Sequence, residues 1–560
     1  KTQAAAEIRL DENNPDSEPV VTITGDQVKQ SGTALSYPWK RRTDYFAEIK
    51  VTDETGDHAE SGKISFTTGK RKERWSADWI AAEEGDSCHP ILRKTFSTKK
   101  GIRMSRFYGT GVGIFEVYRN GGKQGREYLT PYVTNYEKHL QTFTYMVDED
   151  IREGEENTLE ILLGKGWYLG TFGLEGADRN YGSRMAAIGE LYITYLDGTE
   201  EVICTDESWT YHASDFEDSG IYLGEILNRE LWKGKENPER PVSVIRDPAH
   251  TPGCENLIKE HLSDRLSLPV VVKEELPVKE VLHTPAGETV LDFGQNFAGF
   301  VRLTAAFPAG TTVKLEFGEI LQEGNFYHKN YRDAVSELVY TSDGREETVE
   351  THFTFYGFCY VKGSGIPGEV KASDFTGCVL YSDLDRTGFI ETGDARFDRL
   401  YQNTIWGQRS NFIDIPTDCP QRSERLGWTG DTQVFAPTAC YHTDARAFYH
   451  KFIRDLRDEQ EFLNGGVPNY VPNIGHKDDC GSVWGDIATL LPETLYQAYG
   501  DLSEAEYAYP LMKDWVDWID RGDLARGERK YLNDFVFTFG DWLALDGATP
   551  TSFKGSINIL

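Results

Sequence analysis

Apolar and polar residues alternate in short segments over the first two thirds of the chain. The alternation is clear in residues 45–51 and at Val313, Leu315 and Phe317. A period of two places every second side chain on the same face of a pleated strand. Because turn-forming residues separate these segments, we expect β-sandwich modules over most of residues 1–386.

Beyond residue 394 the apolar positions recur every three to four residues, which predicts amphipathic helices. Asp394 precedes the first of them and is a suitable N-cap. The apolar positions of three predicted helices are Phe397, Leu400, Tyr401 and Ile405, then Phe448, Phe452, Leu456 and Leu463, then Leu511, Trp515, Trp518 and Ile519. Polar and aromatic loops separate these helices, so we expect a helical toroid with its functional site at one rim.

These changes of pattern divide the chain into four predicted domains, in keeping with its 560 residues. Residues 1–72 are predicted to form a small sandwich of fibronectin-like or immunoglobulin-like type that lacks some strands. Residues 73–236 are predicted to form a jelly-roll sandwich of carbohydrate-binding type, and residues 237–386 a third sandwich. Residues 387–560 form the predicted helical domain.

Two aromatic turn motifs in the β region have competing interpretations. G-K-G-W-Y-L-G at residues 164–170 is either a sugar-stacking platform or an aromatic plug of a sandwich, and the plug is favoured. D-F-G-Q-N-F-A-G-F at residues 292–300 favours a bulged turn over a catalytic segment.

Charge and cysteine content narrow the classes of partner. The net charge of −32 argues against nucleic acids and anionic membranes, because both are polyanions. The eight cysteines are scattered without a C-x-x-C pair, so we expect buried thiols and no metal site. No signal-peptide or transmembrane run is present, but the chain begins with Lys1. A periplasmic or secreted location after leader removal and a cytoplasmic one both stay open, as does the oligomeric state.

Residues 411–431, N-F-I-D-I-P-T-D-C-P-Q-R-S-E-R-L-G-W-T-G-D, concentrate the candidate chemistry. Prolines remove backbone donors and glycines permit turns, so this segment is predicted to be an ordered loop. Its acids are Asp414, Asp418, Glu424 and Asp431. Cleavage of a glycosidic bond needs two carboxyl groups, so the loop indicates a carbohydrate site. Helix capping and backbone binding by the same acids are about equally expected.

Glu424 is the candidate general acid, because its longer side chain can reach into a cleft. Holding a proton near neutral pH requires burial or anionic neighbours, which Asp418 and Asp431 can supply. We therefore expect Arg422 and Arg425 to pair with the other carboxylates. Asp418, Asp431 and Arg422 are expected to bind ring hydroxyls. The candidates for an apolar wall are Trp428, Trp484 and Trp542.

The string D-C-P-Q-R-S-E-R-L-G-W-T-G-D-T-Q-V-F-A-P-T-A at residues 418–439 resembles the signature loop of bacterial α-L-rhamnosidases, glycoside hydrolase family 78. The likeness extends to D-F-G-Q-N-F-A-G-F, to F-Y-G-F-C-Y-V at residues 355–361, to G-S-V-W-G-D-I-A at 481–488 and to G-D-W-L at 540–543. The resemblance implies tandem β-sandwich modules followed by an (α/α)6 barrel. It also implies hydrolysis of terminal α-L-rhamnosides with inversion, without a cofactor.

Carried over to the matching positions, the resemblance makes Glu424 the general acid. It also implies that Asp418, Arg422, Trp428 and Asp431 contact rhamnose and that Trp484 and Trp542 form aromatic walls. A rhamnose-containing glycoside or oligosaccharide is the implied partner.

This sequence departs from the family pattern at two positions. Cys359 stands where arginine is usual, which predicts the local loss of an ion pair. Ser423 stands where an acidic residue is common, which removes one negative neighbour from Glu424.

Residues 394–560 have room for roughly half of the twelve helices of such a barrel, given helices of about 11–12 residues. No segment matches the family's general base, which is therefore expected outside the recognisable part of the chain. A fragment, a catalytically incomplete carbohydrate-binding relative and an inverting glycosidase for another sugar stay open as alternatives.

Overall fold

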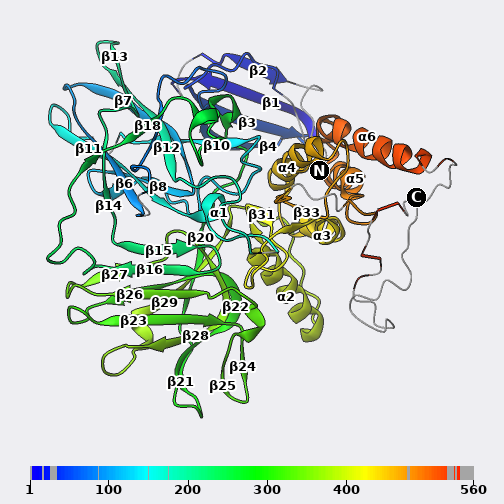
Figure 1. Ribbon diagram of the computed structural model, residues 1–560. Helices are drawn as coiled ribbons and strands as arrows, with labels where there is room; N and C mark the ends of the chain where they lie inside the picture. Colours follow the sequence, from blue (N-terminus) through cyan, green and yellow to red (C-terminus); the bar gives the residue numbers. More distant parts are fainter. Residues whose placement is uncertain are drawn as a thin grey trace.

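The computed structural model describes residues 3–14, 18–24, 35–85, 88–148, 151–174, 176–475, 480–525, 527, 535–536, 539–540 and 542. Three β-rich regions lie on one side of the molecule and the long helices lie on the other (Figure 1). All eight cysteines are free thiols, three of them buried and five partly buried. Among the described helices, none combines the length and the apolar character needed to cross a membrane.

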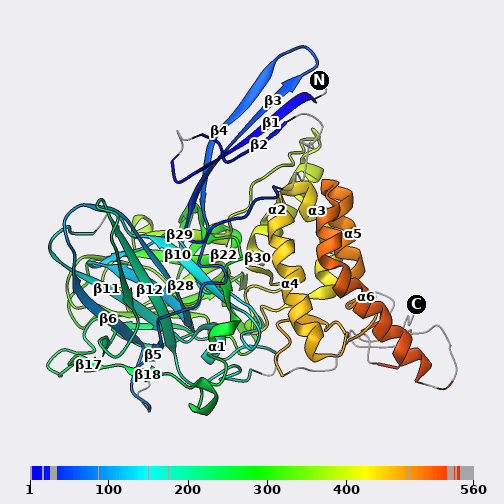
Figure 2. The same cartoon turned by 90° about the horizontal axis from the view of Figure 1, so that it is seen from above.

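The N-terminal region is a four-stranded antiparallel sheet in the order β2-β1-β3-β4. Its strands are β1 (Gln3–Glu12), β2 (Val21–Thr24), β3 (Asp44–Asp53) and β4 (His58–Thr67). The sheet projects away from the rest of the β region (Figure 2). The described residues form one sheet here, where the pattern predicted a sandwich. Alternation identifies a strand, but it does not show whether a second sheet covers that strand.

The second region stacks two sheets, one of seven strands and one of six. The first has the order β18-β5-β12-β7-β10-β19, with β13 added to β12, and the second has the order β17-β14-β6-β11-β8-β9. The strands are β5 (Trp79–Ala81), β6 (Pro90–Ser97), β7 (Ile102–Val112), β8 (Ile114–Arg119), β9 (Gly122–Lys123), β10 (Leu140–Met146), β11 (Glu156–Gly164), β12 (Ala186–Tyr195), β13 (Glu200–Cys204), β14 (Thr210–Ala213), β17 (Arg240–Pro241), β18 (Ser243–Ile245) and β19 (Leu262–Asp264). All ten residues of β12 are buried, so the core of this region runs along that strand.

The third region is a ten-stranded sheet in the order β15-β16-β26-β23-β28-β22-β29-β20, with β21 and β27 paired to β22. The strands are β15 (Phe216–Gly220), β16 (Gly224–Asn228), β20 (Val270–Pro277), β21 (Glu280–His283), β22 (Thr289–Ala305), β23 (Thr312–Gly318), β26 (Glu337–Thr341), β27 (Glu347–Val349), β28 (Tyr356–Ser364) and β29 (Phe375–Ser382). A hairpin of β24 (Ile320–Gln322) and β25 (Asn325–Tyr327) extends from it.

The chain exchanges strands between the second and third regions. Strands β15 and β16 belong to the ten-stranded sheet, whereas the later strands β17, β18 and β19 return to the two stacked sheets. The division predicted between residues 236 and 237 therefore does not coincide with a change of sheet. Strand order depends on contacts between distant segments, which periodicity does not report.

The two aromatic turn motifs have the structural roles that were favoured. Residues Gly166–Leu169 form α1, and its Trp167 and Tyr168 are buried, as expected of a plug. The pairing of β22 with β28 shifts register between Asp292 and Phe297, which confirms the bulge. On β28, the Cys359 Sγ atom lies 3.8 Å from Asp292 Oδ1.

The helical region contains α2 (Ala395–Asn411), α3 (Thr429–His442), α4 (Arg446–Phe462), α5 (Ile487–Tyr499) and α6 (Leu502–Leu524). Asp394 caps α2 by accepting a hydrogen bond from Arg396 N, as predicted. The predicted apolar faces of α4 and α6 are confirmed by the burial of Phe448, Phe452, Leu456, Leu511 and Trp515.

The predicted inward face of α2 is wrong in its first half. Phe397 and Leu400 are each 61% exposed, whereas Ile405 and Gln408 are buried. Helix α2 packs against β22 and β29, and its buried positions lie in its C-terminal half. Helical spacing identified the helix correctly, but it does not report how much of the helix is covered.

Candidate active site

Two short strand pairs bracket the acidic loop. Strand β30 (Phe412–Ile413) pairs with β31 (Ile415–Pro416), and β32 (Gly427–Trp428) pairs with β33 (Tyr470–Val471). The chain between β31 and β32 is neither helix nor strand. Asp418 and Arg425 both have φ of 56°, so the chain turns sharply near each end of this segment. The prediction of an ordered loop is confirmed.

Arg425 fastens the loop to the β regions. Its side chain is buried and donates to Ile221 O and Phe355 O, each at 2.7 Å. The Tyr222 hydroxyl donates to Glu424 O at 2.7 Å and fixes the loop from the same side. The expectation that Arg425 pairs with a carboxylate is therefore wrong. Burial lowers the pKa of its guanidinium to about 10, and backbone carbonyls supply the acceptors that a buried guanidinium requires.

Donors surround both carboxylate oxygens of Glu424, whose side chain is only 6% exposed. Trp428 Nε1 donates to Oε1 at 2.6 Å, and Arg332 Nη1 donates to Oε2 at 3.0 Å. Arg422 Nε lies 2.9 Å from the same Oε2 atom. The expectation that Arg422 avoids Glu424 is wrong, because the fold of the loop turns the guanidinium back toward a carboxylate only two residues away.

Arg332 is the contact that sequence reasoning missed. It follows the 3-10 turn η4 (Lys329–Tyr331) and adopts φ 57° and ψ −121°, a conformation rare for residues other than glycine. Two hydrogen bonds hold its segment beside the loop. Ser423 N donates to Tyr331 O at 3.2 Å, and Asp333 N donates to the Ser423 hydroxyl Oγ at 3.3 Å. Because 92 residues separate Arg332 from Glu424, no local pattern links them.

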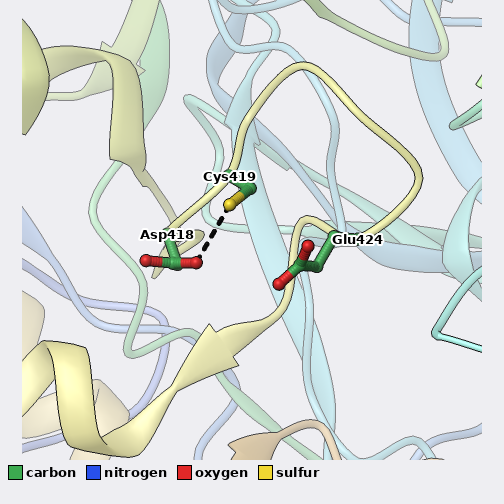
Figure 3. A group of neighbouring side chains, drawn as sticks. All are labelled: Asp418, Cys419 and Glu424. Carbon is green, nitrogen blue, oxygen red and sulfur yellow. Dashed lines mark hydrogen bonds between the residues drawn. The ribbon is translucent and has the colours of Figure 1, made fainter. Parts of the chain in front are cut away.

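Asp418 and Cys419 lie beside Glu424 on the same loop (Figure 3). The Cys419 thiol donates to Asp418 Oδ2 at 3.0 Å. Burial, together with the Asp418 carboxylate, raises the pKa of this thiol far above its usual value. Burial also raises the pKa of Asp418.

These three residues form one group of possible metal ligands among the described residues, with ligand atoms within 4.8 Å of one another. The arrangement suits a metal ion poorly. The Cys419 thiol retains its proton, and the guanidiniums of Arg332 and Arg422 already lie on Glu424. It suits hydrogen bonding to hydroxyl groups better.

Asp431 lies in the first turn of α3, at the solvent-accessible edge of the site. The surrounding protein desolvates its carboxyl group, and the charges of Asp418 and Glu424 add to the effect, so its pKa rises to about 6. This carboxyl group therefore gains or loses its proton near neutral pH.

The three predicted wall tryptophans converge on one ring, that of Phe539. Its centroid lies 5.7 Å from the ring of Trp428, 4.9 Å from that of Trp484 and 5.3 Å from that of Trp542. Trp484 also packs on Gly430, where a Cβ atom would lie 2.8 Å from the indole. The structure thus brings the predicted tryptophans together and adds Phe539.

A cleft of about 800 Å³ adjoins the loop on the side of the β regions. Ser423, Asp333 and Tyr222 line it next to the loop, and Lys165 and Asp218 also belong to its lining. Glu424 itself is not among the lining residues, so this cleft adjoins the loop rather than the carboxylate.

Three family models match consecutive parts of the chain. The α-L-rhamnosidase N-terminal domain matches residues 100–244, the bacterial α-L-rhamnosidase concanavalin-like domain matches residues 282–381, and the bacterial α-L-rhamnosidase 6 hairpin glycosidase domain matches residues 385–559. The last match places the helical region in the domain type predicted as an (α/α)6 barrel.

Curated relatives carry the same description. An α-L-rhamnosidase of Streptomyces avermitilis is 36% identical over 459 residues, which are 80% of this chain and 43% of the relative. One of Alteromonas sp. is 34% identical over 493 residues, which are 84% of this chain and 51% of the relative. The chain thus spans about half the length of the curated relatives it matches.

Solved structures of α-L-rhamnosidases are similar to the structure of this chain. The α-L-rhamnosidase of Aspergillus terreus superposes with a TM-score of 0.87 at 29% identity, covering 97% of this chain and 64% of that one. The Streptomyces avermitilis enzyme complexed with L-rhamnose superposes with a TM-score of 0.84 at 25% identity, covering 98% and 70%. By its matched domains, its curated relatives and its fold, the chain belongs to the bacterial α-L-rhamnosidase family.

Proposed function

We propose that this protein hydrolyses terminal α-L-rhamnosides with inversion of configuration and that Glu424 is the general acid. The placement of Glu424 carries the proposal. Its carboxylate is enclosed on a loop that Arg425 fastens to the β regions, and Trp428 Nε1 fixes one oxygen at 2.6 Å. An acid held in one orientation can protonate a leaving oxygen efficiently.

The neighbouring groups fit a deoxy sugar. Asp418, Asp431 and Arg422 offer charged partners for vicinal hydroxyls. The tryptophans that converge on Phe539 offer an apolar surface for the methyl group and the less polar ring face. The known complex of the Streptomyces avermitilis relative with L-rhamnose supports the choice of sugar.

The general base of the proposed reaction is not Asp418. Oxygen atoms of Asp418 and Glu424 lie within 4.8 Å of each other, whereas an inverting pair keeps about 6.5–9.5 Å between its carboxyl groups to admit water. We therefore assign Asp418 to sugar binding and expect the base to face Glu424 across the sugar ring.

Proton delivery also requires a rearrangement at Glu424. Its Oε2 atom lies 3.0 Å from Arg332 Nη1 and 2.9 Å from Arg422 Nε. With two guanidinium groups this close, the Oε2 atom has no room for the leaving oxygen of a substrate. At least one guanidinium must turn away when substrate binds, and Arg422 can do so by engaging a sugar hydroxyl.

Replacement of Glu424 by glutamine tests the role of the acid. We expect Glu424→Gln to lower kcat for an alkyl rhamnoside by about 10²–10⁴-fold, because general acid catalysis supplies a factor of that size. Circular dichroism should stay unchanged. Glu493→Gln, on the exposed side of α5, is the matched control and should retain full activity. Normal turnover by the Glu424 variant would rule out its role, and proton NMR of the anomer released first tests inversion.

A carbohydrate-binding protein without hydrolytic activity is the second candidate. It is favoured by the donors that already occupy both oxygens of Glu424. Calorimetry that detects L-rhamnose binding, combined with no release from a panel of aryl glycosides, would support this function. Release from a different glycoside of the panel would instead identify another sugar.

A further inference from the structure

Two basic runs of the sequence meet where the N-terminal sheet joins the stacked sheets. W-K-R-R occupies residues 39–42, and K-R-K-E-R-W occupies residues 70–75. Arg42 N donates to Gly69 O at 2.9 Å, and the Arg71 guanidinium donates to Trp39 O. The two runs thus form one surface although about 30 residues separate them in the sequence.

This surface is hollowed into a groove. Two adjoining cavities of about 960 Å³ and about 500 Å³ share Trp39, Arg71 and Asp264 in their linings. The lining of this basic groove has no residue in common with the cleft beside the acidic loop, and it contains none of the residues around Glu424. It is therefore a site separate from the proposed active site.

The charge of the groove lining is opposite in sign to the net charge of the whole chain. Its charged lining residues are the cations Arg41, Lys70, Arg71, Lys72, Arg74, Lys259 and Arg265 and the acids Glu73, Glu260 and Asp264. Cations outnumber acids here, whereas the whole chain has a net charge of −32. Lys70, Lys259 and Arg265 are neutralised by ion pairs with Glu190, Asp78 and Glu127, which lie outside the lining. Four cations and three acids of the lining remain. A local positive field on an acidic protein favours an anionic ligand.

Several of these cations are available to a ligand. Lys72 and Arg74 are exposed, and no hydrogen bond or ion pair with another described residue engages their side chains. Arg41 is 58% exposed and lies 3.5 Å from Glu73, which pairs more closely with Arg42 at 3.0 Å. Exposed cations of this kind are more often simply solvated than bound to a ligand. The case for a ligand site therefore also depends on the aromatic residue between them.

Trp39 supplies a fixed aromatic surface in the groove. Its ring is held edge-on by Tyr45 at 5.0 Å, by Tyr37 at 5.2 Å and by Phe66 at 5.7 Å. A rigid indole that lines both cavities can stack against a sugar ring, while neighbouring guanidiniums pair with carboxylate or sulfate oxygens.

We propose that the basic groove binds an acidic saccharide chain, whose anionic groups are carboxylates or sulfates. The Trp39 ring favours a ligand that contains a sugar ring, and the excess of cations favours a ligand that carries negative charge. Two adjoining cavities provide length for more than one sugar unit. The site would hold a polymeric ligand to the protein independently of hydrolysis at Glu424.

Binding of defined oligosaccharides to the full chain tests the proposal. The probes are a galacturonate oligomer, a sulfated galactan oligomer and the neutral methyl ester of the galacturonate oligomer. We expect calorimetry to detect at least one acidic probe and no neutral ester, with an affinity that falls as salt rises. Binding of one acidic probe alone identifies the anionic group. The double variant Lys72→Glu/Arg74→Glu should bind about tenfold or more weakly, because it reverses two charges.

The matched control is Lys99→Glu/Lys100→Glu, which makes the same change of charge at exposed positions after β6. It should bind like the unmodified protein, and both double variants should keep activity on an aryl rhamnoside. The proposal fails if neither acidic probe binds at low salt, if both double variants lose affinity equally, or if the neutral ester binds as well. Tighter binding of a single-stranded oligonucleotide would also overturn the assignment to a saccharide.

Discussion

Lys451 and Glu424 each lie in a cluster of opposite charges, but solvent reaches the two clusters very differently. The side chains of Lys451, Asp414 and Asp455 are each 1% exposed. At the other cluster, Arg332 is 48% exposed beside the buried Glu424. An enclosed cation has no alternative partner, whereas an accessible one can exchange its carboxylate for water or a ligand. The comparison therefore separates a cluster that fixes structure from one that can rearrange during binding.

The enclosed cluster positions the acidic loop. Lys451 Nζ on α4 lies 2.8 Å from Asp414 Oδ2 and 2.7 Å from Asp455 Oδ2. It also donates to Val133 O, and Val133 N donates to Asp414 Oδ2 at 2.9 Å. Asp414 occupies the turn between β30 and β31, so this cluster ties α4, the stacked sheets and the start of the loop together.

Removal of the enclosed cation should give the largest effect. Lys451→Met leaves Asp414 as a buried charge without its cation, and breaking a buried pair in this way costs about 3–5 kcal/mol of unfolding free energy. Urea denaturation followed by tryptophan fluorescence measures the loss. Lys513→Met, which removes an exposed pair with Asp517 on α6, should cost far less, because solvent screens an exposed pair. Equal losses in the two variants would contradict the distinction between the clusters.

A pH effect of intermediate size should come from Asp455. Burial raises its pKa to about 8, with Asp414 adding to the shift and Lys451 opposing it. The folded state therefore retains a proton that the unfolded state loses near pH 4. The stability gained from this proton is complete below about pH 4 and is lost as pH rises to about 8, by about 1.4 kcal/mol per pH unit.

Asp455→Asn keeps the shape of the side chain and removes its titratable carboxyl group. We expect the slope of unfolding free energy against pH between 6 and 8 to become more positive by about 1 kcal/mol per unit in the variant. Histidines titrate in the same window in both proteins, so the difference between their slopes isolates Asp455. Identical slopes would show that Asp455 is already ionised in the folded protein.

The sequence was informative where chemistry is local. The prolines, glycines and acids of residues 411–431 identified an ordered loop, and period-two and helical patterns identified strands and helices. The candidate tryptophans were also recognisable, because each lies in a distinctive motif. Their convergence on Phe539 was not, since it depends on the packing of separate loops.

What could not be predicted depends on distant segments. Arg332 reaches Glu424 from the segment that follows β25, and nothing near it in the sequence refers to the loop. The same limit applies to α2, whose exposed Phe397 and Leu400 fit the helical period equally well. Periodicity determines which side chains share a face, whereas the fold determines what that face meets.

Arg332 should give the smallest effect and the most direct test of the rearrangement at Glu424. Its side chain is 48% exposed, so solvent screening limits the pair to about 1 kcal/mol, and Arg332→Gln should change kcat/KM by less than about tenfold. The change should appear in kcat rather than in KM, because a guanidinium against Oε2 affects the proposed proton delivery more than substrate binding. A purely structural role would instead lower the free energy of unfolding. Arg332→Lys, which keeps the charge, should match the unmodified protein in both measurements.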